Sequence, residues 1–253
     1  MSARSLDVAA PAPLAAARAE RRFFVVMALA CVAIAFAGFV SRYFAPVAAG
    51  SFSAPTLVHI HGLVMWSWTL LFAWQSWLAA NGRLRRHRSF GMAGIALFTL
   101  AVWIGVSVAV QQLDRQLSAG AGDTARAFLA MPVSLAAMMV VLFAAAILNA
   151  RRPDVHSRLM LLVTLVALTP ALARLTGDVL GTGPHPRNPV IGGLLALTLV
   201  GIAIARDVRA NGRPHRVYLY AGGFVVGGMI ARSTLNRTET WYAVTDALRM
   251  LAH

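Results

Sequence analysis

Long apolar stretches alternate with short polar connections along almost the whole chain. Each stretch is about 20 residues long, the length at which an α-helix crosses roughly 30 Å of hydrocarbon. The connections between the stretches leave no room for a soluble domain of any size. The pattern therefore predicts an all-α polytopic membrane protein, a helical bundle of seven transmembrane helices. The predicted helices cover residues 22–45, 56–80, 89–112, 125–149, 158–177, 189–207 and 216–235.

The composition agrees with this class, because 58% of the residues are hydrophobic and only 13% are charged. Residues 1–21 are rich in alanine, arginine and proline, which predicts a mobile basic cytoplasmic tail. Residues 22–253 then form a single transmembrane helical domain.

The positive charge has an uneven distribution that predicts the orientation in the membrane. The net charge is +14, and all 23 basic residues are arginines. Most of them lie before the first predicted helix or in three connections, which we call the joints: residues 81–88, 151–158 and 211–216. The opposite connections carry a much weaker bias. Because arginine-rich loops stay in the cytoplasm, we expect the N-terminus inside and the C-terminus, after seven crossings, outside. Arginines in short membrane loops do not indicate a nucleic-acid partner; their expected partner is the lipid bilayer.

The chain contains no lysine. A retinal Schiff base requires a lysine amine, so a relationship to the microbial rhodopsins is excluded.

Each joint carries one histidine, namely His87, His156 or His215. Each lies in or just before the first turn of a helix, where the helix dipole favours a neutral imidazole that can bind a metal. Two of them, His87 and His156, could ligate one haem iron axially, with joint arginines on the propionates. All three could instead form a zinc site with an open position. The alternative is that they contact lipid phosphates beside the arginines.

The second predicted helix opens with His59 and His61, near the expected outer face. Residues two apart on a helix differ by about 200° in direction, so at most one points into the bundle. We favour His61, because Gly62 beside it leaves room for a flat ligand. Arg174 and Arg232 are expected at a similar depth, where guanidinium groups could hold haem propionates. Alternatively, each arginine reaches the outer headgroups or pairs with Asp178 or Asp246.

A resemblance to known families follows from four motifs. They are His59-x-His61-Gly62, His87-Arg88-x-x-Gly91, His156-x-Arg158-Leu159-Met160 and Gly212-Arg213-x-His215.

From about residue 55 onward, this order resembles a family of uncharacterised bacterial multi-helix inner-membrane proteins. More loosely, it is similar to the cytochrome b561 arrangement, which implies haem b held by helix-borne histidines. The chain departs from that arrangement because the outer side lacks an obvious second in-membrane histidine to complete a bis-histidine pair. His185 or Met131 could substitute for it.

Three functions remain open from the sequence. The first is b-type haem binding with an electron-transfer role, exchanging electrons with quinone or another membrane redox protein, with His87 and His156 as the axial pair. The second is a non-enzymatic role as an assembly factor or small-solute carrier. The third is a zinc-dependent membrane hydrolase, for which the usual metal motifs and paired carboxylates are absent. Whether the protein is an enzyme is therefore left open.

Overall fold

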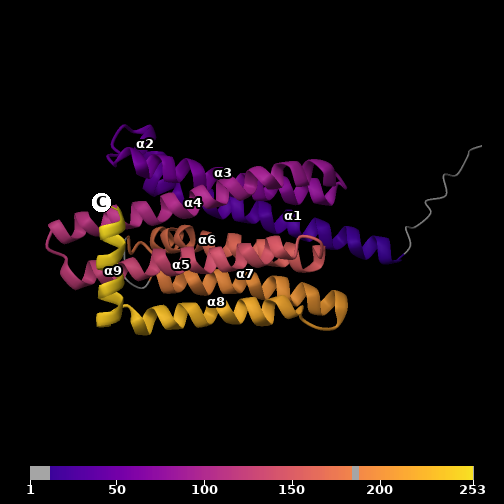
Figure 1. The fold of residues 1–253 in the computed structure, drawn as a ribbon. Helices are drawn as coiled ribbons and strands as arrows, with labels where there is room; N and C mark the ends of the chain where they lie inside the picture. Colours follow the sequence, from indigo (N-terminus) through magenta and orange to yellow (C-terminus); the bar gives the residue numbers. More distant parts are fainter. Residues whose placement is uncertain (1–11, 184–187, 253) are drawn as a thin grey trace, which may run out of the picture.

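The computed structural model describes residues 12–183 and 188–252, and it is a bundle of long helices (Figure 1). All seven predicted apolar segments are helical. The elements are α1 (Ala12–Phe39), a π-helical turn η1 (Val40–Phe44), α2 (Ala45–Ala48), α3 (Thr56–Ala80), α4 (Leu84–Ser118), α5 (Gly122–Leu148), α6 (Pro153–Val179), α7 (Asn188–Asn211), α8 (Arg216–Leu235) and α9 (Glu239–Ala252).

Six helical segments of the described chain are long and apolar enough to span a membrane. This supports an integral multi-pass membrane protein. Helix α8, which the sequence analysis counted as a seventh span, is not among the six. It has 20 residues, but its glycines, tyrosines and Arg232 lower its hydropathy. The six segments run over Ala16–Ala48, Thr56–Ala80, Leu84–Ser118, Gly122–Leu148, Pro153–Val179 and Asn188–Asn211.

The three joints lie at the same end of the bundle, together with the beginning of α1 (Figure 1). We call this end the arginine end. Glycines end the helices at two joints: Gly82 (φ 69°) follows α3 and Gly212 (φ 72°) follows α7, in the left-handed conformation that an Asn-Gly pair predicts. At the remaining joint, Pro153 begins α6, where its missing N–H is not needed. The joints therefore turn the chain sharply and set α3–α4, α5–α6 and α7–α8 as antiparallel pairs.

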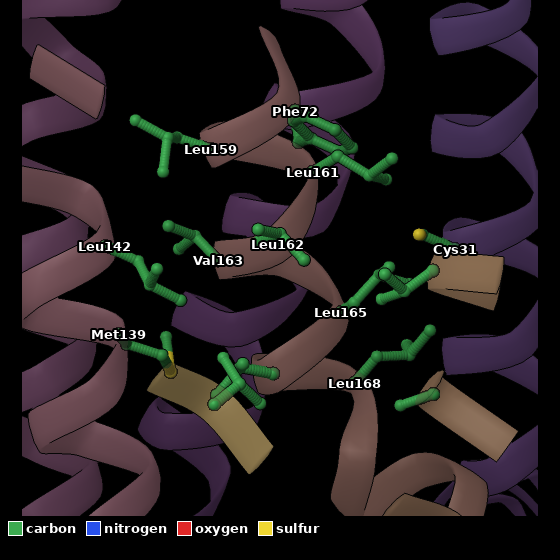
Figure 2. Close-up of a cluster of buried hydrophobic side chains, with 14 of the residues drawn as sticks. Cys31, Phe72, Met139, Leu142, Leu159, Leu161, Leu162, Val163, Leu165 and Leu168 are labelled. Carbon is green, nitrogen blue, oxygen red and sulfur yellow. The ribbon is translucent and has the colours of Figure 1, made fainter. Parts of the chain in front are cut away.

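Helix α6 forms the centre of the bundle. In its most apolar 18-residue stretch 72% of the residues are buried, against 22–33% in the other five candidate spans. Figure 2 shows α6 leucines such as Leu161 and Leu165 between Cys31 of α1, Phe72 of α3 and Met139 of α5. A helix that is apolar on all sides can pack in this way.

Small residues bring the neighbours of α6 close to its backbone. A Cβ on Gly38 of α1 would lie 2.3 Å from the Ala171 carbonyl oxygen, and one on Gly192 of α7 would lie 2.7 Å from the Ala173 nitrogen. Close approach of this kind is how helices associate in membranes, where no water is released on contact.

Two elements at the ends differ from the sequence analysis. Helix α1 begins at Ala12, so residues 12–21 of the segment expected to be a tail belong to it. The short helix α9, which was not predicted, lies across the end of the bundle opposite the joints (Figure 1). It is anchored by Trp241, whose indole N–H donates to the Arg126 carbonyl (2.7 Å), and by an ion pair between Arg126 and Asp246 (3.1 Å).

Candidate functional site

The strongest candidate site is the pair His87 and His156 at the arginine end. His87 lies in the first turn of α4 and His156 in the first turn of α6. Their ring centres are 6.3 Å apart and their planes are nearly perpendicular, at 85°. The structure thus brings together the two joint histidines that the sequence analysis paired as axial ligands, although 69 positions (156 − 87) separate them.

Each of these rings is held by the helix that precedes it in the chain. Nδ1 of His87 lies 3.2 Å from the carbonyl oxygen of Gln75 in α3, and Nδ1 of His156 lies 2.9 Å from that of Ala146 in α5. A carbonyl oxygen can only accept, so each Nδ1 carries the hydrogen and donates it. The lone pair of each neutral ring is therefore on Nε2. This is the usual arrangement of a metal-binding histidine, in which the second nitrogen fixes the ring.

His215 at the third joint is used differently. It is the N-cap of α8, where its Nδ1 accepts a hydrogen bond from the Val217 N–H (3.2 Å). The hydrogen of the neutral ring must then be on Nε2, which lies 3.4 Å from Asp154 and donates to that carboxylate. Both nitrogens are occupied, so His215 would have to leave its cap to bind a metal.

The alternative zinc site of three joint histidines is not supported. Residues 12–183 and 188–252 contain no group of three or more His, Cys, Asp or Glu side chains that could hold a metal ion. The hydrogen bonds explain why the three joint histidines do not form one metal site. Of the three, His87 and His156 keep a free Nε2 lone pair, whereas Nε2 of His215 donates to Asp154.

A buried ion network that the sequence analysis missed lies in the same end of the bundle. The Arg158 side chain is 2% exposed and donates from Nε and Nη2 to the two Asp207 carboxylate oxygens, at 2.8 and 2.7 Å. Its Nη2 also pairs with Glu20 of α1 at 2.9 Å, and its Nη1 donates to the Asp154 carbonyl at 2.8 Å. Arg206 joins both carboxylates from the α7 side, at 3.6 Å from Glu20 and 3.0 Å from Asp207. The network ties α1, α6 and α7 together.

At the opposite end, His59 and His61 do point in different directions. Nδ1 of His59 lies 2.9 Å from the Tyr43 hydroxyl, so this ring faces η1. His61 faces α4, since a Cβ on Gly105 would be 3.5 Å from its Cε1. Nδ1 of His61 is buried and has no hydrogen-bond partner in the described part of the chain. Both residues are half-buried, and their rings face different elements, as helix geometry predicts.

Arg174 and Arg232 do not form the predicted ion pairs. The Arg174 guanidinium lies over the Phe39 ring, 4.8 Å from its centre, and donates to the Pro170 carbonyl at 3.0 Å. Arg232 lines a small apolar cavity between α5, α6, α7 and α8. The alternative in which either arginine pairs with Asp178 or Asp246 is wrong.

Those two carboxylates have other partners. Asp178 pairs with Arg42 at 3.2 Å and accepts a hydrogen bond from Ser41, while Asp246 pairs with Arg126. Of the substitutes suggested for a second outer ligand, Met131 packs half-buried against the hydrophobic core. His185 lies outside the described residues.

No family model, curated protein or solved structure matches this chain.

Proposed function

We propose that this integral membrane protein binds one haem b at the arginine end, where Nε2 of His87 and Nε2 of His156 would hold the iron, and that it has an electron-transfer role. The separation of the two rings supports the proposal. A metal–nitrogen bond is about 2.0 Å and the nitrogen lies about 1.2 Å from the ring centre, so two imidazoles that bind the same metal have centres no more than roughly 6.4 Å apart. The observed 6.3 Å lies within this limit.

The fixed ring nitrogens give a second reason for choosing these two residues. Nδ1 of His87 and Nδ1 of His156 are both committed to carbonyl oxygens, which leaves both Nε2 atoms as acceptors for a metal. The main chain thus orients the rings before any ligand arrives, which reduces the entropy lost on binding. The exposed arginines next to them, Arg88 and Arg151, provide guanidinium groups for two propionates.

The haem would supply one-electron redox chemistry, and His87, His156 and the neighbouring arginines of this chain would hold and orient it. Its electron partner, in this proposal, is quinone or another membrane redox protein reached at the same end of the bundle. The arginine bias supports a cytoplasmic position for that end in a bacterial inner membrane, with the N-terminus inside and α8 as a seventh crossing.

The absorption spectrum of the protein purified in detergent from haem-supplied cells tests this function. We expect a Soret band, sharp α and β bands after dithionite, and a pyridine haemochrome equivalent to one haem b per chain. His87→Ala and His156→Ala should each lose most of the reduced bands. His215→Ala is the matched control, because it removes a joint histidine whose nitrogens are already occupied, and it should keep the spectrum.

Two results would overturn the proposal. One is colourless wild-type protein that is folded by circular dichroism; the other is a double variant His87→Ala/His156→Ala that retains the full haem content.

A further inference from the structure

A second feature of the arginine end is an open groove of about 990 Å³ between α5, α6 and α8. It is separate from the histidine pair, since neither His87 nor His156 lines it. Its walls are of two kinds. Toward the joints it is lined by Arg152, Arg158, Arg213 and Arg216, and toward the middle of the bundle by apolar side chains that include Val141, Leu142, Ala145, Ala221 and Phe224.

The positive charge of the groove is not neutralised by its own carboxylates. Two acidic residues line it, and both are already paired. Glu20 pairs with Arg158 and Arg206, and Asp154 pairs with His215. Among the described residues no carboxylate pairs with Arg152, Arg213 or Arg216. Three guanidinium groups therefore remain available at the mouth.

We propose that this groove binds one anionic phospholipid, with its phosphate on Arg213, Arg216 and Arg152 and an acyl chain along α5 and α8. A phosphate presents several oxygens to the forked donors of arginine, which suits a cluster of three. A soluble anion would use only the basic half of the groove and would leave Leu142 and Phe224 without a ligand contact. Only an amphiphile matches both halves, and the α5 and α6 walls belong to candidate membrane spans.

Retention of phosphatidylglycerol measured by native mass spectrometry tests the inference. The detergent-solubilised wild type should bind one copy of phosphatidylglycerol far more tightly than phosphatidylcholine. The variant Arg213→Gln/Arg216→Gln should bind it about 25-fold more weakly, since each basic residue near an anionic lipid contributes about fivefold. The charge-matched control is Arg85→Gln/Arg86→Gln, which removes two exposed arginines from another joint and should retain the lipid.

A second pair of variants tests the apolar half of the groove without changing the charge. Ala221→Trp fills the groove beside α5 and should weaken lipid binding, whereas Ala231→Trp, on the exposed side of α8 beyond the groove, should not. The arginine variants and Ala231→Trp should melt at the temperature of the wild type, because those residues are exposed. Ala221 is partly buried against the core, so the melting temperature of Ala221→Trp must also be shown to match that of the wild type before its lipid binding is compared.

Three results would overturn the inference. The first is equal loss of lipid in the groove variant and in its charge-matched control. The second is displacement of the lipid by millimolar inorganic phosphate, which would identify a soluble-anion site. The third is normal lipid binding by Ala221→Trp, which would mean that the acyl chain lies elsewhere or that an acidic protein segment is the true occupant.

Discussion

Replacing Asp207 by asparagine should destabilise the protein more than any other single change at its few carboxylates. The substitution keeps the shape of the side chain and removes its charge. Asp207 and Arg158 are each 2% exposed and share two hydrogen bonds, at 2.8 and 2.7 Å. Removing one partner of a buried pair leaves the other charge without compensation, which costs about 3–5 kcal/mol.

The other partners of Arg158 determine whether the loss of unfolding free energy lies near the lower or the upper end of this range. Glu20 stays 2.9 Å from Arg158, but its side chain is 34% exposed, and pairs open to solvent contribute only about 0–1 kcal/mol. We therefore expect Asp207→Asn to lower the free energy of unfolding by about 3 kcal/mol, which is roughly a hundredfold in the folding equilibrium. Glu20→Gln should lower it by no more than about 1 kcal/mol.

Reversible unfolding in mixtures of mild detergent and SDS, followed by tryptophan fluorescence and circular dichroism, measures these differences. A double variant, Arg158→Met/Asp207→Leu, separates the loss of the pair from the loss of one partner. Because it leaves no buried charge between the two positions, it should be more stable than Asp207→Asn alone. The reasoning fails if Asp207→Asn unfolds within 1 kcal/mol of the wild type, or no earlier than Glu20→Gln.

Three further outcomes follow from the packing and the charge bias. Gly38→Ala should destabilise the protein by about 1–3 kcal/mol in the same assay, because its Cβ would clash with the Ala171 carbonyl oxygen. Gly105→Ala is the control and should stay within about 0.5 kcal/mol of the wild type, because the nearest atom to its Cβ, Cε1 of His61, is 3.5 Å away. An equal loss of stability in both variants would contradict the packing argument. Trp241→Phe removes the bond to the Arg126 carbonyl (2.7 Å) and should speed amide hydrogen exchange in α9 while leaving α6 protected; unchanged exchange in α9 would show that other contacts hold the helix. Reporter fusions should place the joints in the cytoplasm and the C-terminus outside, and a cytoplasmic C-terminus would remove α8 from the crossings.

Much of the fold could be predicted from the sequence, because the relevant signals are local. Apolar length predicted all seven long helices, and the Asn-Gly pairs predicted where α3 and α7 end. The proximity of His87 and His156 also follows from local rules. Both residues lie in a first turn at the same end of neighbouring hairpins, so the connectivity alone brings them to one level of the bundle.

The parts that could not be predicted depend on which side chain meets which. Arg158 is the last residue of a charged joint, and its sequence context is that of a loop arginine. It is nevertheless buried, because Asp207, 49 residues later, and Glu20, in the expected tail, both pair with it. The same holds for His215. Its joint resembles that of His156 in composition, and only the positions of Asp154 and the Val217 N–H show that its nitrogens are occupied.

The shortage of carboxylates links these observations. The chain has nine acidic residues against 23 arginines, and in the described structure three of them, Glu20, Asp154 and Asp207, lie at the arginine end. All three are paired within the protein. Arginines that hold the bundle together, such as Arg158, are thus the ones that meet these carboxylates. Those left over at the joints have no internal counterion, and they are the groups available for propionates in the proposed haem site and for phosphate in the groove. Neutralising Arg213 and Arg216 should therefore weaken lipid binding without changing stability, whereas neutralising Asp207 should lower the free energy of unfolding by about 3 kcal/mol.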